Sequence, residues 1–181
     1  VTGPPFLLSS NMGHPSVSLD GTMVYTLLRQ ANASQLVTVS REGQILETLT
    51  GIMQAVSYPA IAPDGNRIAY SARERQNADI YVLDRTTGIR NRLTMSNEEN
   101  SSPVWIPGTD RIAYTSPSGD CNAIWALNAD GTGQTELIVE KASLPSLGPD
   151  GRDLVFTTQC SKERGLMRYR IGEDTPPELL R

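Results

Sequence analysis

The sequence predicts an all-β protein, a β-propeller of four blades with four antiparallel strands in each blade, and three observations support this. First, the 181 residues include 15 Gly and 12 Pro, which interrupt regular structure too often for long helices. Second, the same four short blocks of residues recur in the same order four times along the chain. Third, several of the predicted strands are apolar at both odd and even positions, so they need cover on both faces.

The repeat begins each time at a proline that precedes a short apolar segment. These prolines, at positions 15, 59, 103 and 145, are separated by 44, 44 and 42 residues. The second block lies at 23–25, 68–70, 112–114 and 154–156, the third at 36–40, 80–84, 124–128 and 166–170, and the fourth at 49–50, 93–94, 137–138 and 179–180. Four strands in about 40 to 45 residues are typical of one propeller blade.

Each block is short, is rich in β-branched and aromatic residues, and is bounded by turn residues, as expected of a strand. Asp-Gly between the first two blocks supplies the positive φ of a tight turn. Residues 80–83 and 124–127 are apolar at both parities, which a radial stack of blades explains. Residues 27–36 contain Ala and Gln, as a short helix would, but they occupy the slot between the second and third strands and are interpreted as a loop.

The second repeat carries the clearest motif, Pro-x-Ile-Ala-Pro-Asp-Gly-x-x-Ile-Ala-Tyr, which ends at Tyr70. With residues 79–84 and 92–94, it resembles the WD-repeat-like β-propeller repeat of TolB-type proteins, and the resemblance covers residues 6–181. The first repeat has Leu19 in place of the proline before Asp-Gly, and the third inserts residues at 107–110. The resemblance implies a bacterial scaffold for protein contacts. Related propellers are joined to signalling kinases, winged-helix regulators and prolyl-oligopeptidase-type hydrolases.

The repeat also predicts the domain organisation. We expect blades at 15–58, 59–102, 103–144 and 145–181, preceded at 1–14 by a linker and the outer strand of a preceding or closing blade. Residues 6–9 add a seventeenth strand to the sixteen of four blades, and four blades are at the lower limit for closure. We therefore expect either a segment of a larger propeller or two copies that associate to complete one.

Composition and motifs argue against several classes of function. The apolar stretches are too short to insert into a membrane, and 16 basic against 20 acidic residues, with no basic run, argue against nucleic-acid binding. A lone histidine and the lack of a nucleophile elbow, a Cys-x-x-Cys or a phosphate loop predict no enzyme, cofactor or metal. We interpret Asp20, Asp64 and Asp150 as turn-forming residues rather than calcium ligands.

We expect a protein, or a peptide or glycan, to bind the face that carries the loops between repeats. His14 lies at the position of Tyr58 in the next repeat, and Glu98, Glu99 and Asn100 lie in a later loop of that face. The alternatives are a capping role for the histidine and a solvated rim for the acidic residues. Trp105 and Trp125 are predicted to be core residues. A second hypothesis is the accessory, substrate-gating propeller of a prolyl-oligopeptidase-like hydrolase whose catalytic domain is encoded elsewhere.

Cys121 and Cys160 occupy the same loop, between the second and third strands, in adjacent repeats. That placement on one face predicts a disulfide and, with it, a soluble protein of the periplasm or another extracytoplasmic compartment. The alternative is two unrelated free thiols, because the loop conformation decides whether the Cα atoms lie within about 7 Å of each other.

Overall fold

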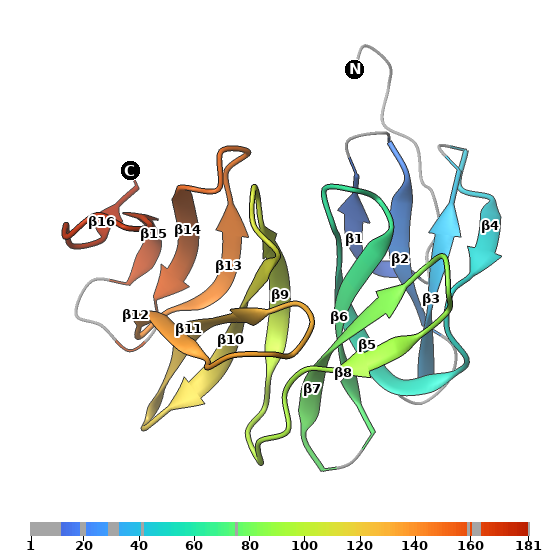
Figure 1. Ribbon diagram of the computed structural model, residues 1–181, viewed down its shortest axis with the longest axis horizontal. Helices are drawn as coiled ribbons and strands as arrows, with labels where there is room; N and C mark the ends of the chain where they lie inside the picture. Colours follow the sequence, from blue (N-terminus) through green and yellow to red (C-terminus); the bar gives the residue numbers. More distant parts are fainter. Residues whose placement is uncertain are drawn as a thin grey trace.

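The computed structural model describes residues 12–18, 21–28, 33–40, 42–74, 76–158, 160 and 164–180. These residues form sixteen strands and no helix (Figure 1). The strands are antiparallel to their neighbours and fall into four groups of four. The predicted all-β propeller fold is therefore confirmed. The strand predicted at 6–9 lies outside the described residues.

We call the four groups blades 1 to 4. Blade 1 contains β1 (Met12–Val17), β2 (Met23–Leu28), β3 (Ala33–Val39) and β4 (Ile45–Thr48). Blade 2 contains β5 (Met53–Ile61), β6 (Arg67–Arg73), β7 (Ala78–Asp84) and β8 (Arg90–Arg92). Blade 3 contains β9 (Ser101–Ile106), β10 (Arg111–Ser118), β11 (Cys121–Asn128) and β12 (Glu136–Glu140). Blade 4 contains β13 (Ser143–Leu147), β14 (Asp153–Thr158), β15 (Gly165–Arg170) and β16 (Glu178–Leu179).

Blades 3 and 4 are separate sheets, whereas blades 1 and 2 form one continuous sheet of eight strands. The connection is made by β5, whose first residues, Met53 and Gln54, pair with Ser34 and Ala33 of β3. The connection between the first two repeats is therefore a strand from Met53 onward, whereas we expected a loop between repeats. The inner strand of blade 2, β5, begins before its proline because its first residues pair with backbone groups of β3, the third strand of blade 1.

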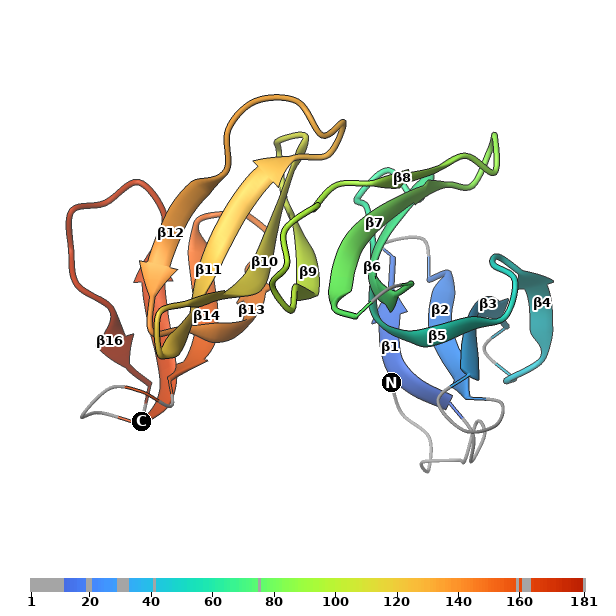
Figure 2. The same ribbon diagram turned by 90° about the horizontal axis from the view of Figure 1, so that it is seen from below.

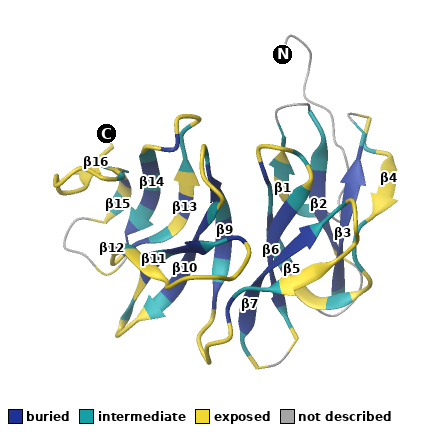
Figure 3. Ribbon diagram, viewed as in Figure 1, coloured by how far each residue is buried: buried dark blue, intermediate teal, exposed yellow. Residues whose placement is uncertain are grey.

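Residues on both faces of a blade are buried because each blade packs against the next (Figure 3). In blade 2, Tyr81 and Leu83 belong to the core shared with blade 1, and Ile80 and Val82 belong to the core shared with blade 3. A third core joins blades 3 and 4. The apolar pattern of residues 80–83 thus has the origin predicted from the sequence. Seen from below, blades 3 and 4 lie on one side of the molecule and blades 1 and 2 on the other (Figure 2).

Hydrogen bonds within each Pro-Asp-Gly turn stabilise the turn conformation. In blade 2, Gly65 has a φ of 73° and its N–H donates to the carbonyl oxygen of Ala62 at 2.9 Å. The Asp64 carboxylate accepts the N–H of Asn66 at 2.8 Å. The equivalent Asp150 accepts the N–H of Arg152 at 3.0 Å. Both carboxylates are therefore turn-forming, as predicted, while Asp20 lies outside the described residues.

Because successive strands run in opposite directions, their connections alternate between two faces of the molecule. The connections from one blade to the next share a face with those from the second to the third strand of each blade (Figure 1). We call this side the loop face. In the described part of the chain, no helix is long and apolar enough to cross a membrane.

Candidate functional site

A cavity of about 350 Å³ opens where the four inner strands, β1, β5, β9 and β13, lie together. It is lined by equivalent residues of all four blades, at positions 14–16, 58–60, 102–104 and 144–145. We call it the central pocket. Each blade contributes the proline of its repeat and the residue before that proline, so the repeat itself builds the pocket.

The residues before the four prolines have an unusual backbone. The φ angles of His14, Tyr58, Ser102 and Leu144 are 50°, 50°, 53° and 55°, in the left-handed region that residues other than glycine rarely adopt. Strand pairing is irregular at each of these positions. Proline has no N–H for the ladder, so each inner strand bulges there. The bulges turn four equivalent side chains to the same end of the inner strands.

Two of these side chains form an aromatic contact across the first two blades. The rings of His14 and Tyr58 have their centroids 4.2 Å apart, with an angle of 47° between the planes. Burial lowers the pKa of His14 below its usual 6.5, so the imidazole is neutral at neutral pH. Among the described residues, no Asp, Glu, Lys or Arg lines the central pocket. The pocket is therefore an uncharged site.

The other two side chains add a hydroxyl and an apolar group. Ser102 is 5% exposed, and its Oγ has no hydrogen-bond partner among the described residues. Leu144 is 47% exposed, and its backbone N–H donates to Thr115 Oγ1 at 3.1 Å. We did not predict these two residues as binding residues. The signal for them in the sequence was their position, equivalent to that of His14.

A second cavity, of about 450 Å³, lies along the same inner strands toward the Pro-Asp-Gly turns. It shares Ser16, Ala60 and Val104 with the central pocket. Hydrogen bonds connect neighbouring inner strands beside this cavity. The N–H of Ile61 in β5 donates to Ser16 Oγ in β1 at 3.1 Å. The indole N–H of Trp105 donates to the carbonyl oxygen of Ala60 at 2.9 Å. Trp105 is 6% exposed, which confirms its predicted place in the core.

The acidic loop that we predicted as part of the binding surface does not reach the central pocket. Glu99 pairs with Arg73, and its Oε2 accepts the N–H of Ala78 at 3.2 Å. Asn100 is 1% exposed, and its Nδ2 donates to the carbonyl oxygen of Glu98 at 3.1 Å. Asn100 is buried and holds the loop through this hydrogen bond, and its role in partner binding stays a prediction. Glu98 is exposed and lines a different cavity.

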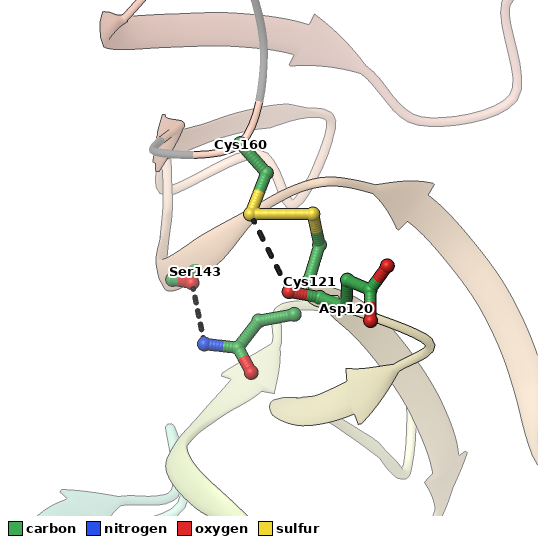
Figure 4. The surroundings of a disulfide bond; sticks show 5 residues. Asp120, Cys121, Ser143 and Cys160 are labelled. Carbon is green, nitrogen blue, oxygen red and sulfur yellow. Dashed lines mark hydrogen bonds between the residues drawn. A yellow bond between two sulfur atoms is a disulfide. The ribbon is translucent and has the colours of Figure 1, made fainter.

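Cys121 and Cys160 form a disulfide between blades 3 and 4, with their Cα atoms 6.0 Å apart (Figure 4). Cys121 begins β11, and Cys160 follows β14. The Sγ atom of Cys160 lies 3.8 Å from the carbonyl oxygen of Asp120. The structure thus adopts the paired alternative of the two that the sequence left open.

Four-stranded blades arranged around a pocket at their inner strands define a β-propeller protein. The chain belongs to the family of the Tricorn protease N-terminal beta propeller domain, whose sequence profile matches residues 12–179. No curated protein matches the chain.

Solved structures show the same fold. TolB from Acinetobacter baumannii superposes with a TM-score of 0.80 at 19% identity, covering 93% of this chain and 43% of that one. A putative TolB from Agrobacterium tumefaciens superposes with a TM-score of 0.81 at 20% identity, covering 92% of this chain and 64% of that one. An acylaminoacyl peptidase from Pyrococcus horikoshii superposes with a TM-score of 0.58 at 16% identity, covering 93% of this chain and 32% of that one. The chain therefore has a TolB-like β-propeller fold and spans less than two thirds of each of these chains.

Proposed function

We propose that the chain is a non-catalytic binding module that holds a protein partner at the central pocket. One observation carries this proposal. All four blades place a residue other than glycine in the left-handed region at the same pocket. Such backbone geometry costs about 1–3 kcal/mol per residue and is often found at ligand sites. A preformed pocket on a rigid scaffold reduces the entropy lost on binding.

The chemistry of the lining favours an uncharged segment of a polypeptide as the ligand. Four prolines and Leu144 give apolar walls, against which an apolar side chain loses contact with water. Ser102 is 5% exposed, so its hydroxyl adds little polar surface to the lining. A glycan would bring many hydroxyl groups to a pocket with few polar side chains, so we favour a peptide.

Selection from a peptide library displayed on phage tests this proposal. We expect the enriched peptides to share uncharged residues, and Tyr58→Ala to weaken their binding about tenfold, as loss of an aromatic anchor commonly does. Leu46→Ala is the matched control, because Leu46 is 65% exposed on the outer strand of blade 1. Equal affinity of the selected peptides for the wild type, Tyr58→Ala and Leu46→Ala would place their binding outside the central pocket and reject the proposal.

A second candidate function follows from the family. Its name refers to the propeller of a protease, and an acylaminoacyl peptidase shares the fold. Under this hypothesis the chain is the accessory propeller of a prolyl-oligopeptidase-like hydrolase and gates access to a catalytic domain. The complete coding sequence separates the two functions. A downstream α/β-hydrolase region with Gly-x-Ser-x-Gly supports the accessory role, and the lack of any hydrolase region contradicts it.

We also propose that the protein works in the periplasm or another extracytoplasmic compartment, where disulfides persist. The bond between Cys121 and Cys160 supports this location. Thiol labelling followed by mass spectrometry of protein isolated from that compartment tests it, and labelling of both cysteines without a reductant would contradict it.

Completion of the propeller by a second copy remains a prediction. Light scattering that shows a stable monomer of about 20 kDa would contradict that prediction.

A further inference from the structure

A groove of about 370 Å³ separates the outer parts of blades 2 and 3 and shares no residue with the central pocket. On one side it is lined by the loop that follows β8, which includes Leu93, Met95 and Glu98. On the other side it is lined by β10 and β11, which provide Tyr114 and Trp125. We call it the aromatic groove.

The aromatic wall consists of two side chains from neighbouring strands. Tyr114 and Trp125 are directly paired in the register of β10 and β11. Tyr114 is 5% exposed, and burial raises its pKa to about 12, so the phenol stays neutral at physiological pH. Trp125 is half-buried. Its Nε1 is buried and has no hydrogen-bond partner among the described residues, which leaves an N–H donor without an acceptor.

The groove has a single charge. Glu98 is the one Asp, Glu, Lys or Arg that lines it within the described part of the chain. Glu98 is exposed, and none of the described ion pairs includes it. The adjacent Glu99 differs, because it pairs with Arg73. Met95 is 78% exposed at the same edge. The groove therefore combines the partly exposed ring of Trp125, an exposed thioether and an unpaired carboxylate.

We infer that the aromatic groove binds a basic side chain, lysine or arginine, of a partner polypeptide. A cation is attracted to the negative face of the half-buried Trp125 ring and to the carboxylate of Glu98. The methylene groups of such a side chain pack against Leu93 and Met95. The inference concerns a second site and does not depend on binding at the central pocket.

NMR of the two indole N–H groups provides a direct test. The probes are N-acetyl-arginine amide and its uncharged counterpart, N-acetyl-citrulline amide. We expect the Trp125 indole resonance to shift with the arginine probe and much less with the citrulline probe. Trp105 is the internal reference, because its indole N–H already donates to Ala60. Trp125→Phe assigns the two resonances by removing one of them.

Substitution of the carboxylate completes the test. We expect Glu98→Gln to weaken binding of the arginine probe about threefold or more, as loss of one charge in a partly exposed site does. Glu140→Gln is the matched control, since Glu140 is exposed and lies outside the groove. Three results would each overturn the inference: equal shifts with both probes, unchanged affinity in a folded Glu98→Gln protein, or no Trp125 shift at about 20 mM arginine probe.

Discussion

The junction between blades 1 and 2 and the junction between blades 3 and 4 join equivalent blades by different means. At the first, β3 pairs with β5, and the buried Ser34 Oγ accepts the N–H of Val56 at 2.8 Å. At the second, the sheets are separate, and Cys121 and Cys160 form a disulfide. The repeat sets the strands within each blade, whereas residues outside the repeat pattern decide how the blades are joined.

Because of this difference, the first junction is expected to respond to pH and the second to a reductant. The first also contains the contact between His14 and Tyr58, so a change in pH acts on it. The second contains a covalent bond that a reductant breaks. Both junctions form walls of the central pocket, since His14 and Leu144 belong to blades 1 and 4. The four predictions that follow separate the two junctions, from the largest expected effect to the smallest.

Removal of the disulfide is expected to have the largest effect. Cys121 and Cys160 are 39 residues apart, and cross-linking a loop of this length stabilises a folded protein by about 4 kcal/mol. We expect Cys121→Ser with Cys160→Ser to lower the free energy of unfolding by this amount in denaturant titrations. Amide exchange should quicken in blade 4 and stay unchanged in blade 1. Faster exchange in blade 1 alone would mean that the disulfide does not hold the second junction.

Gly151→Ala is expected to have the next largest effect on stability. Gly151 has a φ of 70°, and an added Cβ would lie 2.6 Å from the carbonyl oxygen of Pro107 in blade 3. We expect a loss of about 2 kcal/mol, from the backbone conformation and the clash together. Gly108→Ala is the control, because Gly108 has a φ of 75° but open space around it. Equal destabilisation of both variants in thermal unfolding would show that the blades are not in close contact there.

Ser34→Ala tests the first junction. Its Oγ accepts the N–H of Val56 and donates to the carbonyl oxygen of Val56 at 3.2 Å. The substitution leaves these buried backbone groups unsatisfied, so we expect a loss of about 1–2 kcal/mol. Ser118→Ala, at an exposed position in blade 3, should change the stability little. If Ser34→Ala instead opened blade 4 in amide exchange, the two junctions would not be independent.

Acidification is expected to have the smallest effect and to act on the first junction. Burial lowers the pKa of His14 below 6.5 in the folded protein, so the unfolded chain takes up a proton first as the pH falls. The contribution of His14 to stability is complete above pH 6.5 and decreases as the pH falls below that value. Comparison of unfolding at about pH 7.5 and about pH 5.5 measures it. His14→Gln, which removes the single histidine, should reduce the dependence, and an unchanged dependence would exclude His14 as its source.

The sequence predicts those parts of the fold that depend on local patterns. The motif around Asp64 and Gly65 specifies its turn through residue type alone, and the apolar run at 80–83 predicts cover on both faces. The extension of β5 to Met53 was missed because it depends on free backbone groups of β3, which residue type does not reveal. The positive φ of Tyr58 was missed for a related reason, because only the following proline marks it. Burial of Asn100 depends on how its loop folds back onto β7.

The central claim of this account is that the central pocket binds a partner at the inner strands of its blades. Amide exchange measured by NMR, with and without a phage-selected peptide, tests it most directly. Ser16, Ala60 and Val104 line the pocket from blades 1, 2 and 3. We predict that the peptide slows exchange of these three amides together, and that Tyr58→Ala removes the effect. Slower exchange confined to the outer strands, such as β4, with no change at the three inner amides, would contradict the account.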